Sequence, residues 1–264
     1  MIIQAKNKLK ELSPLVHIIA GSISVNDCAN FALSTGAKPI TCIYDKETEE
    51  ITKNAKALFV SLAQFDQERI NVAAKAVETA IGEGIPICLD AVGINISKER
   101  FGFFKKITDK FKISVIKGNT AEIKALLNIK AKSTGIDVLP EDFKEEENIE
   151  ICKKAAKKYG TVIFATAKTD IITDGTTVRT VVGGNEAMQL ITGTGCILGS
   201  VCACYLTVEE PLNACVCAST LLKKSGELSY EQGCLKKGIA SYKTGLWDNF
   251  YNLAYTDSLD PLHL

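Results

Sequence analysis

The chain has 264 residues, enough for one large α/β domain or two small ones and for a sizeable hydrophobic core. Hydrophobic residues make up 46% of the chain and charged residues 23%, as in an ordinary globular protein. The 31 Lys and Arg residues balance the 31 Asp and Glu residues, so the net charge argues against a nucleic-acid partner and against binding to an anionic membrane surface.

The first half of the chain alternates short apolar runs with longer segments of helical periodicity. The apolar runs predict strands at residues 15–19, 39–43, 57–62, 86–89 and 113–116. The periodic segments predict helices at residues 24–33, 66–81, 98–110 and 120–127, the second of them capped by Asp66. Because the strands are apolar throughout and alternate with helices, the pattern predicts a parallel sheet covered on both faces.

The second half begins with a polar, charged segment, residues 130–147, which is typical of an exposed connection. A helix is then predicted at 148–158, followed by strands at 162–165, 171–173 and 178–182. The turn Asp174-Gly175 joins the last two strands as a hairpin. Helices are predicted at 196–206, 212–224 and 230–253, and the tail 257–264 is expected to be poorly ordered. Without an internal repeat or a linker, residues 1–264 are predicted to form one domain.

The ten cysteines raise the possibility of a metal site, and one uncharged stretch raises that of a membrane span. No signal-peptide pattern begins the chain, so we expect a cytoplasmic location with reduced thiols that act as small buried hydrophobes. The pairs Cys202/Cys204 and Cys215/Cys217 are two residues apart and face different sides of a helix, which disfavours a zinc site. Residues 187–208 carry no charge, but a glycine turn interrupts them, so a buried helix is favoured over a membrane span.

Ligands of open parallel sheets bind at the carboxyl ends of the strands, and the turn Thr192-Gly193-Thr194-Gly195-Cys196 is the most informative candidate. Its small residues let backbone N–H groups converge, and the next helix points its N-terminus at the same place. This predicts an anion site suited to a phosphoryl group. The structural alternative is a tight turn whose glycines let the helix pack against the sheet. The spacing matches neither a dinucleotide fingerprint nor a P-loop.

Three further places follow predicted strands. Asp90 can hold Mg²⁺ through water or cap a loop. Lys117 can meet a phosphate, while Asn119 and Glu122 fit a capping box, a role that competes with metal binding by Glu122. His17, beside an apolar strand, is more typical of a core histidine than of a catalytic one.

In this order, the four places resemble the hydroxyethylthiazole kinase family, a branch of the ribokinase-like kinases. The resemblance rests on four runs of sequence, namely Leu15-Val16-His17 through Asn26, Ala29-Asn30 and Gly36-Ala37-Lys38-Pro39, then Asp90-Ala91-Val92-Gly93, then Lys117-Gly118-Asn119-Thr120-Ala121-Glu122-Ile123, and finally Thr192–Cys196. Cys196 is the most specific element, because most ribokinase-like kinases carry an aspartate base at this position whereas the hydroxyethylthiazole kinase family carries cysteine. The resemblance implies a three-layer α/β/α sandwich with a mostly parallel sheet. It also implies a homotrimer with active sites at subunit interfaces.

The resemblance further implies transfer of the γ-phosphate of ATP to the primary hydroxyl of 4-methyl-5-(2-hydroxyethyl)thiazole. The implied Mg²⁺ ligands are Asp90 and Glu122. The implied ATP contacts are Lys117, Asn119 and Thr166. The implied thiazole pocket contains Thr41, Gly193 and Asn26. The implied catalytic turn consists of Gly193, Thr194, Gly195 and Cys196. A thiol at this position, with its pKa expected to be lowered by the helix N-terminus, can either accept the proton of the acceptor hydroxyl late or merely orient that hydroxyl, and we hypothesise the weaker role.

The chain departs from the family pattern at several of these positions. Ala20-Gly21 stands where Thr-Asn is usual, and Thr41 stands where Met is usual. Lys117 replaces Arg and keeps the charge without the forked geometry, and Ala91 and Ala167 replace Pro and Gly. These departures leave two alternatives open. One is a kinase for a different small heterocyclic alcohol, and the other is a catalytically silent nucleotide- or thiazole-binding homologue.

Overall fold

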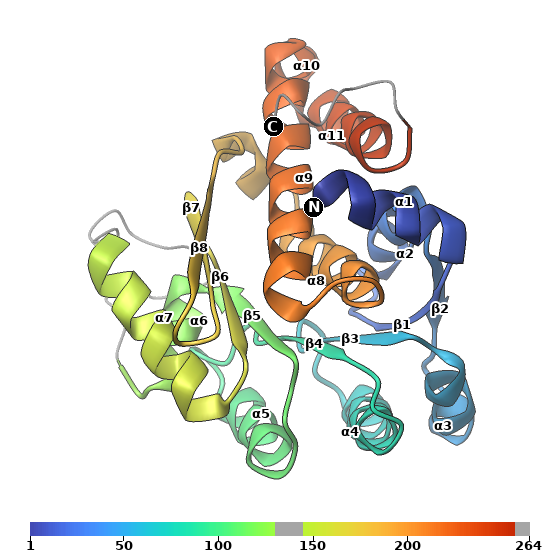
Figure 1. Ribbon diagram of the computed structural model, residues 1–264, viewed down its shortest axis with the longest axis vertical. Coiled ribbons are helices and arrows are strands. Elements are labelled where there is room, and N and C mark those ends of the chain that lie inside the picture. The colour runs from blue at the N-terminus through green and yellow to red at the C-terminus, as the bar shows by residue number, and fades with distance from the viewer. Residues whose placement is uncertain (130–144, 257–264) are drawn as a thin grey trace.

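An eight-stranded sheet forms the centre of the computed structural model, which describes residues 1–129 and 145–256 (Figure 1). In spatial order the strands are β2 (Lys38–Thr41), β1 (Leu15–Ile19), β3 (Ala57–Ser61), β4 (Ile87–Asp90), β5 (Val115–Asn119), β6 (Val162–Thr166), β7 (Thr169–Thr173) and β8 (Val178–Val182). The first six strands pair in parallel, whereas β7 pairs antiparallel with both neighbours. The predicted hairpin between the last two strands is confirmed.

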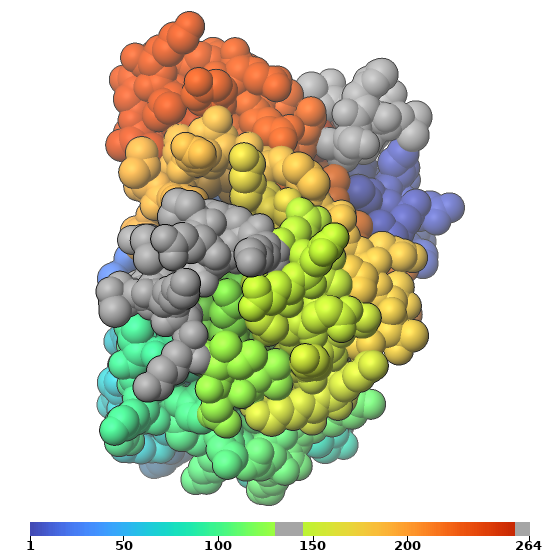
Figure 2. Space-filling view, turned by 90° about the vertical axis from the view of Figure 1, so that its left-hand side faces the viewer, coloured from blue at the N-terminus to red at the C-terminus, as the bar shows by residue number. Residues whose placement is uncertain are grey.

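Helices cover both faces of this sheet. One face carries α1 (Ile2–Leu12), α2 (Val25–Ser34), α8 (Thr194–Leu206), α9 (Pro211–Glu231), α10 (Cys234–Lys237) and α11 (Ile239–Ala254). The other carries α3 (Asp45–Asn54), α4 (Gln67–Gly82), α5 (Lys98–Lys110), α6 (Thr120–Leu126) and α7 (Glu145–Tyr159). Figure 2 shows the side of the molecule that α7 covers, with the C-terminal helices at its upper end. The predicted α/β/α sandwich is confirmed.

The two hydrophobic cores follow from the alternation of side chains along each strand. In β3, Phe59 packs into the core beneath α8 and α9, while Leu58 and Val60 pack into the core against α4. All five residues of β3 are buried, which is why the central strands are apolar at every position. His17 in β1 is also buried, with its Nδ1 3.0 Å from the hydroxyl of Thr52, and burial lowers its pKa to about 4. It is a core histidine, as expected.

The structure differs from the sequence prediction mainly at polar helices. Neither α1 nor α3 was predicted; α3 holds a single large apolar residue, Ile51, so it lacks the periodic apolar signal. Helix α7 begins at Glu145, inside the segment predicted as a connection. The rest of that segment and the tail 257–264 lie outside the described residues. Strand β5 extends to Asn119, past the predicted end at residue 116, because the register with β6 continues to that residue.

Helix α8 is buried from Cys196 to Leu206, which confirms the buried-helix prediction for this uncharged stretch. It lies close to the sheet because residue 199 is glycine, where a Cβ atom would overlap the ring of Phe59. All ten cysteines are free thiols. The Sγ atoms of Cys202 and Cys215 are 3.6 Å apart. Within residues 1–129 and 145–256, no helix is both long and apolar enough to cross a membrane.

Candidate active site

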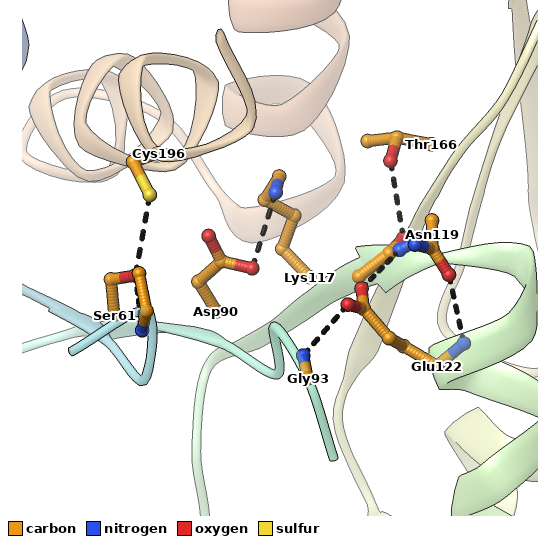
Figure 3. Close-up of polar contacts among 10 residues, drawn as sticks. Ser61, Asp90, Gly93, Lys117, Asn119, Glu122, Thr166 and Cys196 are labelled. Atoms are coloured by element: carbon orange, nitrogen blue, oxygen red, sulfur yellow. Dashed lines mark hydrogen bonds and ion pairs between the residues drawn. The ribbon is translucent and has the colours of Figure 1, made fainter. Parts of the chain in front are cut away.

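Three neighbouring strands carry polar residues near the same edge of the sheet. In the pairing register, Ser61 of β3 lies beside Asp90 of β4, and Asp90 lies beside Lys117 of β5. One strand further, Asn119 pairs with Thr166 of β6. Parallel pairing therefore places Ser61, Asp90 and Lys117 in one row at the carboxyl edge, and Asn119 and Thr166 lie two residues further along their strands. Figure 3 shows Ser61 and Asp90 beneath Cys196 of α8, with Asn119 and Thr166 to one side.

A buried ion pair lies at the centre of the row. The Nζ atom of Lys117 is 3.2 Å from Oδ1 of Asp90, and these residues are 3% and 1% exposed. Burial raises the pKa of Asp90, and the neighbouring ammonium opposes that rise. Burial acts to lower the pKa of Lys117, but the negative charge of Asp90 outweighs it and raises that pKa above its ordinary value. Lys117 therefore stays a cation in a region from which water is largely excluded.

The glycine turn approaches this cation closely. Gly193 is the N-cap of α8 with φ of 86°, and a Cβ there would lie 3.0 Å from Cβ of Ser24. At Gly195, a Cβ would lie 3.2 Å from Nζ of Lys117. The hydroxyl of Thr194 is 3.4 Å from the carbonyl oxygen of Ile191. The backbone N–H groups of the first turn of α8 have no partner within the helix and can donate to a ligand. The positive end of α8 and the Lys117 ammonium thus meet at one place, an arrangement suited to an anion.

Cys196, two residues into α8, faces the ends of β3 and β4 (Figure 3). Its Sγ is 3.4 Å from Oγ of Ser61, and the residue is 6% exposed. Burial, followed by the charge of Asp90, raises the pKa of Cys196. This reverses our expectation of a lowered pKa, because loss of hydration outweighs the helix N-terminus. The thiol is therefore neutral near pH 7.

Ser61 was missed by the sequence analysis. It terminates an apolar strand in the same way that Asp90 terminates the next one. That position was the available signal, but a serine at a strand end is too common to single out by itself.

Glu122 connects two loops of the site. Its Oε2 accepts the N–H of Asn119 at 2.7 Å, and the N–H of Glu122 donates to Oδ1 of Asn119 at 2.9 Å, which confirms the predicted capping box. Its Oε1 accepts the N–H of Gly93 at 2.9 Å, in the loop after Asp90. Burial and then the charge of Asp90 raise the pKa of Glu122 to about 7. Both carboxylate oxygens are thus engaged by backbone donors.

The remaining predicted residues lie at the two flanks. The Thr166 hydroxyl is 3.4 Å from the carbonyl oxygen of Gly118, which keeps it beside the central row. Thr41 is exposed at the end of the edge strand β2, with β1 between it and the strand of Ser61. Asn26 is exposed in the first turn of α2, where it accepts hydrogen bonds from Asn30. The structure therefore groups the phosphate-side residues and sets Thr41 apart at the sheet edge.

Comparison with known proteins shows strong similarity along nearly the whole chain. The sequence model of the hydroxyethylthiazole kinase family matches residues 6–256. Hydroxyethylthiazole kinase 2 of Clostridium botulinum strain Hall is 37% identical over 255 residues, 95% of each chain. The Clostridium tetani hydroxyethylthiazole kinase is 34% identical over 249 residues, covering 93% of this chain and 90% of the relative.

Solved structures show the same relationship. The hydroxyethylthiazole kinase protein of Pyrococcus horikoshii OT3 superposes with a TM-score of 0.85 at 31% identity, covering 95% of this chain and 92% of the other. An ADP complex of Bacillus subtilis pyridoxal kinase superposes with a TM-score of 0.61 at 14% identity, covering 80% and 90%. At that identity the second likeness concerns the fold alone.

Proposed function

The chain belongs to the hydroxyethylthiazole kinase family, and from this premise we propose that it transfers the γ-phosphoryl group of ATP to the primary hydroxyl of 4-methyl-5-(2-hydroxyethyl)thiazole in thiamine biosynthesis or salvage. Family membership makes it a small-molecule kinase. The observation that carries the proposed site is the buried Asp90–Lys117 pair beneath the N-terminus of α8. A cation, a carboxylate and free backbone donors at one sheet edge are the groups that phosphoryl transfer requires.

In this proposal Lys117 and the N–H groups of residues 193–195 stabilise the charge on the transferring phosphoryl group. Lys117 is suited to the role because its ammonium is fixed against Asp90 and shielded from water, which strengthens its electrostatic effect. The hydroxyl of Thr166 and the cap residue Asn119 lie on the next strands and form the proposed side of the ATP site away from the acceptor.

The residues present fit Mg²⁺ at Asp90 and Glu122. Magnesium in kinase sites takes one or two carboxylates together with water and substrate phosphates. When bound, it would neutralise phosphate charge and orient the leaving group. Glu122 would act through water, because both of its oxygens already accept backbone N–H groups.

Cys196 is proposed to orient the acceptor hydroxyl and to take its proton late. A neutral thiol with a raised pKa is a poor base before bond formation begins. It remains able to hydrogen-bond the incoming hydroxyl, and Ser61 fixes its position from β3. Phosphoryl transfer depends mainly on positioning and charge neutralisation, so a weak base suffices.

A homotrimer is proposed from family membership. It is supported by the exposed apolar side chains of Ile23, Ile43 and Tyr44, which are 77%, 66% and 53% exposed near the edge strand β2. A partner covering this edge would also enclose the exposed Thr41, which is proposed to line the thiazole pocket with Asn26 and Gly193. A cytoplasmic location is proposed as well and is supported by the ten free thiols.

A coupled assay of ADP release tests the function. We expect turnover with hydroxyethylthiazole to exceed clearly the turnover with hydroxymethylpyrimidine and other small heterocyclic alcohols. The polar, exposed Thr41 favours one second candidate, a kinase for another alcohol of this class. Preference for such an alcohol would establish it, and absence of ADP release with every alcohol would leave a silent binding protein.

A further inference from the structure

One face of α9 carries three polar side chains directed at β7 and at loops of the sheet. Ser219, Lys223 and Glu227 are spaced four residues apart, so they lie on successive turns of the same face. Helix α9 packs beside β7 and β8 (Figure 1). Ser219 and Lys223 are buried although both are polar. Such residues inside a protein require partners, and the structure supplies them from β7 and from two loops.

Lys223 binds both loops with a single ammonium group. Its Nζ donates to the carbonyl oxygens of Ala167 at 3.0 Å, Lys168 at 2.8 Å and Gly183 at 3.3 Å. Oδ1 of Asp170 lies 3.2 Å from the same Nζ. The first two carbonyls belong to the turn between β6 and β7, and the third follows β8. One cation therefore ties together segments that are separate in the sequence.

Asp170 balances the buried cation and holds the same turn. It is 2% exposed, its Oδ1 accepts the N–H of Ala167 at 3.0 Å, and its Oδ2 accepts the hydroxyl of Ser219 at 2.6 Å. Ala167 is thus held at its N–H by Asp170 and at its carbonyl by Lys223. We call Asp170 and Lys223 the clamp.

The loop after β8 is fitted to α9 by two glycines. Gly183 and Gly184 have φ of 121° and 83°, conformations that L side chains rarely adopt. A Cβ at Gly183 would collide with the carboxylate of Glu227, and the N–H of Gly184 donates to Oε1 of Glu227 at 3.0 Å. The loop therefore follows the helix closely enough for Lys223 to reach its carbonyl.

Both loops lie at the edge of the sheet that holds the candidate active site. Thr169 pairs with Val182, so the turn after β6 and the loop after β8 lie side by side. Strand β6 is parallel to β5, and Thr166 at its end pairs with Asn119. The residue that follows Thr166 is Ala167, which the clamp holds at both of its backbone polar groups.

We propose that Asp170 and Lys223 are positioning residues for the nucleotide, because they hold the turn after Thr166 and the loop at Gly183 as one rigid wall of the ATP site. This inference rests on the proposed function, in which Thr166 contacts ATP. Neither clamp residue needs to touch the nucleotide. They hold the backbone of these two loops in place before the nucleotide binds. Without them the loops would have to become ordered during binding, which would lower the affinity.

Calorimetric binding of ADP with magnesium, measured without acceptor, tests the clamp. Lys223→Met should weaken ADP binding by about tenfold, the effect of losing hydrogen bonds from a charged donor, while the KM for the thiazole alcohol stays unchanged. Its thermal midpoint should also fall, because Asp170 loses its counter-charge. Asp170→Asn/Lys223→Met leaves no buried charge, so we expect the midpoint to recover while ADP binding stays weak. That separation distinguishes positioning from a merely structural role.

Lys158→Met is the matched control, since Lys158 also donates to a backbone carbonyl, that of Leu126 at 2.6 Å, but at the far end of α6. It should leave ADP affinity unchanged. Wild-type affinity in Lys223→Met, or recovery of affinity together with the midpoint in the double variant, would overturn the clamp. If Lys223→Met does not fold, the double variant decides alone. Absence of ADP binding by the wild type would instead overturn the proposed function together with the clamp.

Discussion

The Sγ atom of Cys196 lies 3.4 Å from Oγ of Ser61, across 135 positions of sequence. The contact joins the first turn of α8 to the end of β3, so it links the helix that supplies the anion-binding N–H groups to the sheet that supplies the charged residues. It also gives the thiol one fixed neighbour in a site where its pKa is raised. The first two predictions follow from this pair.

Ser61→Ala should lower kcat by about fivefold and leave the KM for ATP unchanged, because a single hydrogen bond to the thiol contributes about 1 kcal/mol. Steady-state kinetics with each substrate varied in turn provides the measurement. Ser22→Ala is a suitable control, since Ser22 is an exposed serine whose backbone N–H, rather than its hydroxyl, makes the contact to Gln64. An unchanged kcat in Ser61→Ala would show that the thiol needs no partner.

Cys196→Ala should lower kcat by about tenfold to a hundredfold, which is below or at the low end of what full general-base catalysis supplies. The raised pKa of the thiol is the reason for expecting the weaker role. Cys196→Asp should retain activity, because a carboxylate can accept the same proton. A loss far beyond a hundredfold in Cys196→Ala would establish an obligatory base, and an inactive Cys196→Asp would count against the assigned position of the acceptor hydroxyl.

The pH dependence of stability should carry a contribution from Glu122. Its pKa is about 7 in the folded protein, above the ordinary value of 4.5 that applies after unfolding. Between these values the unfolded chain loses the proton while the folded protein keeps it, so stability falls as pH rises from about 4.5 to 7. The contribution is about 3 kcal/mol across that window, and it is constant above and below it.

Urea unfolding of the wild type and of Glu122→Gln at a series of pH values measures this contribution. The variant loses part of the capping box at every pH, so the informative quantity is how the difference in unfolding free energy changes with pH. That difference should shift in favour of Glu122→Gln between pH 4.5 and 7. Parallel curves for the two proteins would show that Glu122 titrates normally.

The polar residues at the sheet edge could be predicted from the sequence because a polar residue directly after an apolar run marks the end of a buried parallel strand. Asp90 and Lys117 are the first charged residues after apolar runs, and the alternating pattern requires such ends to meet at one edge. The capping box was equally readable, because Asn119 and Glu122 are local partners three residues apart.

The features that could not be predicted from the sequence depend on contacts between residues far apart in the chain. The pKa of Cys196 was expected to fall, but its burial beside Asp90 is a property of the assembled site. The clamp joins Asp170 to Lys223, and neither belongs to a local motif. Helix α3 was missed because its buried residues are the polar Thr48 and Thr52, whose hydroxyls face Cys42 and His17 outside the helix.

The final prediction concerns the buried cation. Lys117→Met should remove the counter-ion of the buried Asp90 carboxyl group, so the unfolding free energy should fall by about 3–5 kcal/mol. Activity should fall by about a hundredfold or more, because the transferring phosphoryl group loses a preorganised positive charge. Asp90→Asn/Lys117→Met should recover much of the stability, since neither residue then carries charge, and should remain inactive.

Lys117→Arg provides the conservative control for this position. A guanidinium keeps the charge and adds a forked donor, although it must fit beside Gly195, where the present ammonium is already close. We expect activity within about tenfold of the wild type, since charge rather than shape dominates stabilisation of a phosphoryl group. Urea unfolding measures the stability of the Lys117 variants, and the ADP-release assay measures their activity. If the double variant regained activity along with stability, Lys117 would serve only to neutralise Asp90, and the positive end of α8 alone would hold the phosphate.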